Sequence, residues 1–177
     1  MSSQTHAMGW IIPFAAKAQE TDWEALYKEE LPRIFNFFRY RVGDASLAED
    51  LTSTTFEKAW QHRDRYRRDL AGFSTWLFTI ARNVASDHFR RHTVQVPLED
   101  IHDVPSGSNP EASAVKQAEF QRLSALLASL PERERELLAL KYGAELTNRS
   151  ISHITGLSES NVGSILHRTI HSLRERW

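Results

Sequence analysis

The sequence contains no cysteine, which excludes disulfide bonds and thiolate metal sites and suits a protein of a reducing compartment. Glycine and proline are also scarce, at seven and six residues in 177. The longest apolar run, residues 10–16, is interrupted by Pro13 and is far too short to cross a bilayer. A secretory signal would have a basic segment before its apolar run, and no such segment precedes residues 10–16. We therefore expect a cytoplasmic protein without membrane insertion.

Signatures of catalysis are missing as well. The sequence has no serine elbow, no glycine-rich phosphate loop and no paired catalytic carboxylates, so we expect neither an enzyme nor a cofactor. Two histidine pairs, His88/His92 and His167/His171, have the i, i+4 spacing that can place two imidazoles on one metal ion. Neither pair has a third ligand arranged beside it, so we expect phosphate-facing or solvated histidines and no metal.

Charge is present but unevenly distributed. The whole chain has a net charge of −1, which alone argues against a nucleic-acid partner. Residues 33–92, however, carry eleven Lys/Arg against seven Asp/Glu, and residues 114–177 carry nine against seven. Residues 93–113 between them carry four acidic residues and no basic one. Two basic blocks separated by an acidic segment favour an anionic partner.

The hydrophobic spacing is helical along the chain, which predicts an all-α protein. Capping-box patterns at residues 21–24 and 46–49 predict the starts of the first two helices. Pro32 is expected to kink the first helix or to begin a new one. The second helix is expected to end at Trp60 and to bury a stripe of Ala48, Leu51, Thr55 and Ala59. A third helix is predicted from Phe73 to Arg91, with one apolar face and one polar face.

Residues 93–113 have the composition of a linker, with three prolines and a Ser-Gly-Ser segment. We therefore expect two small helical domains, residues 21–92 and 114–177, joined by an extended acidic linker and preceded by an extension over residues 1–20. This extension is either a disordered tail or a small apolar docking segment. Pro110 is expected to start a helix to about Ser129, and Pro131 to start another that ends near Tyr142.

The segment from Asn148 to Leu166 fits a helix-turn-helix. Ile151 and Ile154 would pack its first helix, and Gly156 supplies a turn that requires an unusual backbone angle. Ser158 caps the second helix, whose first residues would meet base edges in the major groove. A two-helix hairpin with a glycine turn is common, but the exposed side chains here can donate hydrogen bonds to DNA.

Three segments together resemble a known family. Residues 48–60, residues 73–91, and residues 130–135 with 157–168 resemble, in that order, the core-binding helix, the minus-ten-reading helix and the C-terminal promoter domain of extracytoplasmic-function (ECF) sigma factors of bacterial RNA polymerase. The resemblance covers residues 23–175. The chain departs from the family pattern at Ser53-Thr54, where Gln-Glu is common, and at Gly163, Ile165 and Ile170, where basic residues are common.

The resemblance implies a promoter-recognition subunit that binds core RNA polymerase through the β′ clamp and the β subunit, directs it to promoter DNA and helps to open that DNA. An anti-sigma factor is a candidate partner that the sequence leaves open. The expected core-binding residues are Glu49, Asp50, Leu51, Thr52, Ser53, Phe56 and Glu57, of which the polar ones are expected to be exposed. The expected minus-ten residues are Arg63, Arg65, Tyr66, Arg67, Arg68, Phe73, Ser74, Arg82, Asn83, Ser86, Asp87, Arg90 and Arg91. The expected minus-thirty-five residues are Ser158, Ser160, Asn161, Ser164, His167 and Arg168.

The linker length is consistent with these roles. Promoter elements about 25 base pairs apart lie about 85 Å apart at about 3.4 Å per base pair. An extended segment of about twenty residues covers about 65–70 Å, and the domains supply the rest.

Two other functions remain open at this point. Residues 146–149 followed by 156–158 also resemble the helix-turn-helix of stand-alone LuxR-like transcriptional regulators, which would bind an operator without polymerase and would leave residues 48–91 unexplained. A metal-dependent nuclease or hydrolase could use the histidine pairs, and metal analysis would test that hypothesis.

Overall fold

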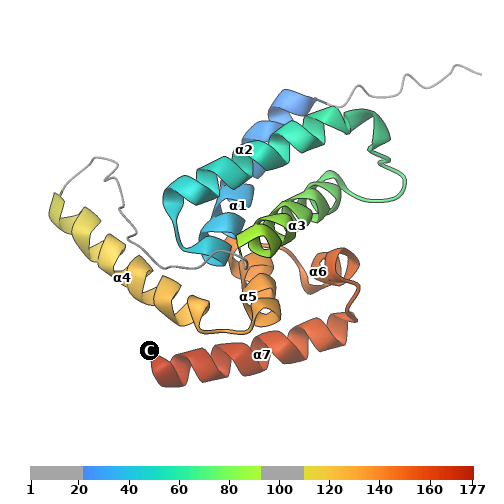
Figure 1. Cartoon of the computed structure of the whole chain (residues 1–177). Helices are drawn as coiled ribbons and strands as arrows, with labels where there is room; N and C mark the ends of the chain where they lie inside the picture. The colour runs from blue at the N-terminus through green and yellow to red at the C-terminus, as the bar shows by residue number, and fades with distance from the viewer. Residues whose placement is uncertain (1–21, 93–109) are drawn as a thin grey trace, which may run out of the picture.

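The computed structural model describes residues 22–92 and 110–177, which form helices and turns with no strand among them (Figure 1). The prediction of an all-α protein is confirmed. Among the described helices, none is long and apolar enough to cross a membrane. The expected N-terminal extension, residues 1–20, and most of the expected linker lie outside the described residues.

Helix α1 (Trp23–Val42) begins at Asp22, whose carboxylate accepts a hydrogen bond from the N–H of Ala25 at 3.0 Å. The predicted capping box at residues 21–24 is therefore wrong, because the aspartate one position later makes the cap. Pro32 lies inside α1, which continues on both sides of it, so no new helix begins there. The helix ends at Gly43, where φ is 75°, a left-handed angle that glycine adopts without strain.

Helix α2 (Ala45–Gln61) is also capped by an aspartate. The carboxylate of Asp44 accepts from the N–H of Leu47 at 2.6 Å, so the predicted cap at Ser46 is wrong. The predicted buried stripe of Ala48, Leu51, Thr55 and Ala59 is confirmed. A single 3₁₀ turn, η1 (Arg63–Arg65), follows, and helix α3 (Phe73–His92) then runs one residue beyond its predicted end.

The second group of helices begins with α4 (Pro110–Ala128), which starts inside the range expected for the linker. Helix α5 (Glu132–Leu138) is followed by a π-helical turn, η2 (Ala139–Gly143), where one continuous helix to Tyr142 was predicted. Helices α6 (Asn148–Thr155) and α7 (Glu159–Arg176) complete the chain.

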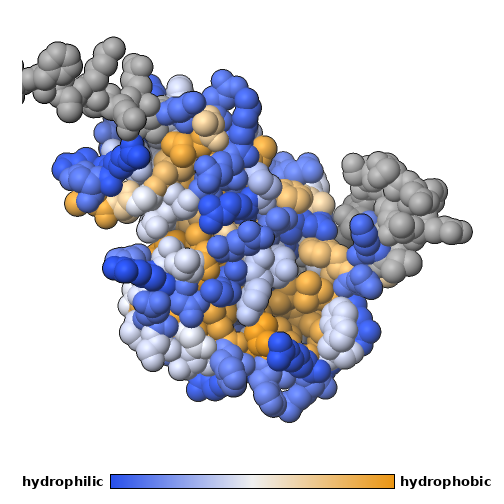
Figure 2. Space-filling view, turned by 180° about the vertical axis from the view of Figure 1, so that it is seen from behind, coloured by the Kyte–Doolittle hydropathy of each residue, from blue (hydrophilic) through white to orange (hydrophobic). Residues whose placement is uncertain are grey.

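The two groups of helices pack directly against each other. The buried apolar side chains form one cluster that includes Phe37 and Phe78 from the first group and Leu140 and Ile151 from the second. Helix α1 packs against η2 and α5, and α3 packs against α6 (Figure 1). Seen from behind, the surface is largely hydrophilic, with apolar side chains gathered in a hollow in the lower half, where α4–α7 lie (Figure 2). In this arrangement the two groups share a core.

Candidate nucleic-acid interface

The outer face of α2 is acidic. Glu49, Asp50, Ser53 and Glu57 are exposed, and Phe56 is half-buried beside them. The periodicity of the helix brings these side chains onto one surface, opposite the buried stripe. Together they form an acidic strip that a basic partner surface would complement.

Two residues expected on that face are not available there. Thr52 is only 4% exposed, and its hydroxyl donates to the carbonyl of Ala48 at 2.7 Å. Leu51 is 7% exposed and belongs to the core. The expectation that Thr52 is exposed is therefore wrong, because residues 51 and 52 both fall on the side of α2 that faces α1 and α3. A threonine can be buried there because its hydroxyl bonds back to the helix.

The connector between α2 and α3 keeps two of its four arginines engaged within the chain. Arg63 donates to the carbonyl of Trp60 at 2.8 Å and lies over the Trp60 ring at 4.4 Å. Arg67 makes a two-pronged pair with Asp69, at 3.0 and 2.9 Å, and this hydrogen bonding lowers the pKa of the Asp69 carboxyl. Arg65 and Arg68 are exposed to solvent. These two are the connector arginines best placed to meet phosphates.

An aromatic cluster anchors the connector to the helices. Tyr66 and Phe73, two of the expected minus-ten residues, pack edge-on or tilted against Trp23, Trp76 and each other, with ring centroids 5.2–6.4 Å apart. Such pairs stabilise packing beyond the area that they bury. An open, mostly apolar cleft of about 460 Å³ borders the cluster and is lined by Trp23, Glu24, Tyr27, Phe56, Ala59, Trp60 and Phe73.

Ser74, one of the expected minus-ten residues, belongs to a buried polar network. Its hydroxyl donates to the carboxylate of Glu30, which is only 2% exposed. Arg33 also donates to Glu30, at 2.9 and 3.0 Å, and to the Ser74 hydroxyl at 3.2 Å. Glu30 and Arg33 were not singled out from the sequence, because a charged residue on an amphipathic helix is usually solvated.

The polar face of α3 is partly occupied. Arg82 donates to the carboxylate of Glu136 at 2.9 Å, and Asp87 accepts from Arg90 at 3.0 Å and lies 3.7 Å from Lys58. Asn83, Ser86 and Arg91 are exposed, and no partner is recorded for them among the residues that the structure describes. On the polar face of α3, these three side chains are therefore the ones that remain open to a partner.

The helix-turn-helix is built as predicted. Thr147 caps α6 by accepting from the N–H of Ser150 at 3.1 Å, and Gly156 ends that helix with φ 74°. Ser158 caps α7 by accepting from the N–H of Asn161 at 3.2 Å. Ile151, Ile154 and the inner residues of α7 are buried. All six expected minus-thirty-five residues are exposed: Ser158, Ser160, Asn161, Ser164, His167 and Arg168.

Ser152 of α6 links the two sides of the helix-turn-helix. Its hydroxyl donates to the carbonyl of Leu157 at 2.6 Å, across the glycine turn. The bond pins the two helices of the motif at a fixed angle.

The histidine pairs do not gather metal ligands. Within residues 22–92 and 110–177, no group of three or more His, Asp or Glu side chains is placed to hold a metal ion. The rings of His88 and His92 stack with their centroids 4.0 Å apart. Partial burial and, to a smaller extent, the charge of the neighbouring His92 lower the pKa of His88. His171 lies 3.5 Å from Glu175. This arrangement gives the hydrolase hypothesis no support.

Comparison with known proteins agrees with the geometry. Residues 26–94 match the family model for sigma-70 region 2, and residues 126–175 match that for sigma-70 region 4. The chain is 32% identical over 152 residues to the ECF RNA polymerase sigma factor SigM of Bacillus subtilis, covering 85% of this chain and 92% of that one. It is 27% identical over 179 residues to the ECF sigma factor RpoE of Cereibacter sphaeroides, covering 99% and 98%.

Solved structures share the fold. The sigma factor RpoE in complex with the anti-sigma factor NepR from Bartonella quintana aligns with a TM-score of 0.68 at 23% identity, covering 87% of this chain and 95% of that one. CnrH in complex with the cytosolic domain of CnrY aligns with a TM-score of 0.59 at 20% identity, covering 85% and 82%.

Proposed function

Because the chain belongs to the ECF family of RNA polymerase sigma factors, we propose that its two groups of helices divide promoter recognition between them. Residues 21–92 bind core polymerase and the minus-ten element, and residues 114–177 bind the minus-thirty-five element. Sigma factors are initiation factors without catalysis of their own, and the polymerase supplies the chemistry. The site of action is then the cytoplasm, where the bacterial polymerase transcribes. A stand-alone LuxR-like regulator does not account for the match over residues 26–94.

Core binding uses the acidic strip of α2. Glu49, Asp50, Ser53 and Glu57 project from it, with Phe56 as an apolar neighbour. These charges would steer and orient the clamp of the β′ subunit if its surface is basic at this point. Thr52 and Leu51 support the strip from beneath and do not contact the clamp.

The minus-ten strand passes along α3 and the connector. Arg65, Arg68 and Arg91 are exposed cations for phosphates, and Asn83 and Ser86 can hydrogen-bond to base edges. Arg63, Arg67, Ser74, Asp87 and Arg90 are engaged within the chain and shape this surface. Tyr66 and Phe73 hold the connector against the helices.

The single observation that carries the assignment to DNA is the exposed polar face at the start of α7. Six side chains able to bond to bases or phosphates follow a capped glycine turn, on the helix that a helix-turn-helix places in the major groove. Asn161 can pair with a base edge, whereas Arg168 suits a phosphate.

An anti-sigma factor is a further proposed partner. The RpoE neighbour from Bartonella quintana was solved in complex with the anti-sigma factor NepR, and its fold is shared by this chain. A protein that binds across the two groups of helices would keep them from polymerase.

The test is reconstitution with bacterial core polymerase. We expect the purified protein to co-elute with core and to direct transcription from a subset of promoters, and to bind a promoter duplex weakly without core. Tight operator binding without polymerase, together with no effect on transcription by core, would refute the proposal. A triple variant Asn161→Ala, Ser164→Ala, Arg168→Ala is the matched control, because it should retain core binding and lose promoter use.

A further inference from the structure

The cleft of about 460 Å³ beside the aromatic cluster leaves large apolar side chains in contact with water. Trp60 and Tyr27 are 55% and 45% exposed, and Phe56 is half-buried. The rings of Tyr27 and Phe56 lie with their centroids 4.5 Å apart, and Trp23 meets Trp60 edge-on at 6.1 Å, so the rings support one another. A concave site of this volume with aromatic walls is typical of a binding site. We call it the aromatic cleft.

A segment of the same chain has the matching chemistry. Residues 7–16 carry no charged side chain, and positions 10–14 read Trp-Ile-Ile-Pro-Phe. Eight residues, 15–22, join this apolar run to Trp23, which itself lines the aromatic cleft. Eight extended residues reach up to about 26–29 Å. A segment tethered this closely has an effective concentration on the order of mM at the cleft.

The other segment outside the described residues, 93–109, matches the aromatic cleft less well. It contains three acidic residues and no Lys or Arg. It also follows His92, at the opposite end of α3 from Phe73, which lines the cleft. A helix of 20 residues is about 30 Å long. Both charge and position therefore favour residues 10–14 as the occupant.

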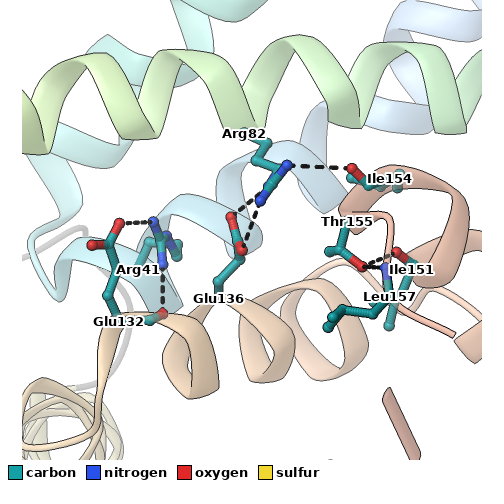
Figure 3. Close-up of polar contacts among 8 residues, drawn as sticks. All are labelled: Arg41, Arg82, Glu132, Glu136, Ile151, Ile154, Thr155 and Leu157. Atoms are coloured by element: carbon teal, nitrogen blue, oxygen red, sulfur yellow. Dashed lines mark hydrogen bonds and ion pairs between the residues drawn. The ribbon is translucent and has the colours of Figure 1, made fainter. Parts of the chain in front are cut away.

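A second cleft offers the apolar run a poorer seat. This cleft, of about 400 Å³, lies between α3 and α5 and is lined by charged side chains that include Arg82, Glu132 and Glu136. Arg82 pairs with Glu136 at 2.9 Å, and Glu132 lies 3.3 Å from Arg41 (Figure 3). An apolar segment would displace water from these charges, which is unfavourable. In the aromatic cleft it would cover apolar surface instead.

We propose that residues 10–14 of this chain bind in the aromatic cleft formed by α1, α2 and the start of α3, and thereby cover Phe56. The rings of Trp10 and Phe14 can pack edge-on against the aromatic walls. Covering Phe56 masks part of the surface proposed to bind core polymerase, so the segment and core compete for it. This second step rests on the proposed function, whereas the binding of the segment does not.

Disulfide formation tests the binding of the segment, because the chain has no cysteine of its own. Two cysteines join only when their Cα atoms approach to about 4.4–6.8 Å. Ile11→Cys is combined in turn with Tyr27→Cys and with Trp60→Cys, both at exposed positions on the cleft. The matched control pairs Ile11→Cys with Glu29→Cys. Glu29 is exposed on α1 at a similar tether length, but lies about 200° around the helix from Tyr27.

We expect both cleft pairs to form a disulfide within one chain much faster than the control pair. Adding Trp10→Ser and Phe14→Ser to the Ile11→Cys/Tyr27→Cys protein should lower its rate to that of the control, because the tether remains while the apolar contacts are lost.

Core binding is measured on the cysteine-free chain. If the docked form holds about 90% of the molecules, Trp10→Ser with Phe14→Ser should tighten the apparent Kd for core polymerase about tenfold. Met8→Ser, in the same uncharged segment but outside the apolar run, is the matched control and should leave this Kd unchanged.

The possible outcomes are distinct. Equal disulfide rates in the cleft and control pairs would overturn the binding of the segment, and disulfides formed only between chains would overturn it in favour of a second copy. Cleft-specific disulfides without tighter core binding by the serine variant would overturn the masking of Phe56. If no form bound core, the proposed function would fail and the masking with it. The disulfide rates would still show whether the segment binds, so the two failures can be told apart.

Discussion

Asn83 provides a direct test of the proposal that α3 holds the minus-ten strand. Its side chain is exposed on α3, next to Arg82, which is tied to Glu136, and no bond to it is recorded within the described residues. Replacing an exposed side chain that packs against nothing usually changes stability by no more than about 0.5 kcal/mol. A functional defect in Asn83→Ala with an unchanged unfolding curve would therefore report on a binding partner and not on folding.

The expected size follows from one neutral hydrogen bond to an extruded base. Such a bond contributes about 0.5–1.5 kcal/mol, which corresponds to up to about a tenfold loss of open complex. Extruding a base costs a few kcal/mol, and this cost is absent when the DNA is already melted. Asn83→Ala should depress open-complex formation on duplex promoters, more strongly than Ser86→Ala on the same face. Most of the loss should be restored on a template with mismatches through the minus-ten element.

The assay is the yield of open complex, read by permanganate reactivity or by a short transcript, on matched duplex and premelted templates. Unfolding curves for Asn83→Ala and Ser86→Ala serve as the control for stability. If the defect were equally severe on both templates, the residue would act in core binding or folding, and the assignment of this face to base capture would be refuted.

Three further predictions follow from burial and backbone geometry. Asp50→Arg should weaken co-elution with core polymerase and leave the unfolding temperature unchanged, because Asp50 is exposed. Leu51 is buried, so Leu51→Ala should instead lower the free energy of unfolding by about 2–5 kcal/mol. Unchanged co-elution of Asp50→Arg would show that α2 is not part of the core interface. Gly156→Ala should lower the free energy of unfolding by about 1–2 kcal/mol because φ is 74° there. Gly163→Ala should raise it by up to about 1 kcal/mol, because the added Cβ would make an ordinary contact with Asn148 at 3.5 Å. Denaturant unfolding measures both changes, and equal effects would contradict the turn geometry. Arg168→Ala should weaken use of all promoters alike and Asn161→Ala should change base preference at the minus-thirty-five element, and identical shifts in a promoter library would contradict this division.

Local patterns predicted the parts of the fold that depend on local physics. The buried stripe of α2 follows from helical periodicity, and the turn at Gly156 follows from the need for a left-handed residue between two capped helices. The two helix starts were misplaced because serine, threonine and aspartate all cap well, and in both cases a nearby aspartate makes the bond. Thr52 was misassigned because a polar residue beside a buried leucine can satisfy its own hydroxyl.

Contacts between distant parts of the chain could not be predicted in this way. The bond from Arg33 to Ala144 spans 111 residues, and no periodicity signals it. Arg82 lies on a polar face of α3, which indicated a residue free for DNA, yet Glu136 occupies it. Arg33, Arg41 and Arg82 each donate to a backbone carbonyl of the second group of helices. Every residue carries such a carbonyl, and no sequence motif marks it.

That choice of acceptor has a consequence for how such a protein can diverge. A side chain at position 144 or 154 can be exchanged without removing the carbonyl that accepts from Arg33 or Arg82. The residues proposed to read bases lie on another helix, α7. Promoter preference can therefore change during evolution while the hydrogen bonds between the two groups of helices are retained. Position 143 is the exception, because its neighbours leave no room for a side chain. Selection on the packing between the two groups of helices would then fall on one glycine and a few arginines, independently of selection on which promoters the protein recognises.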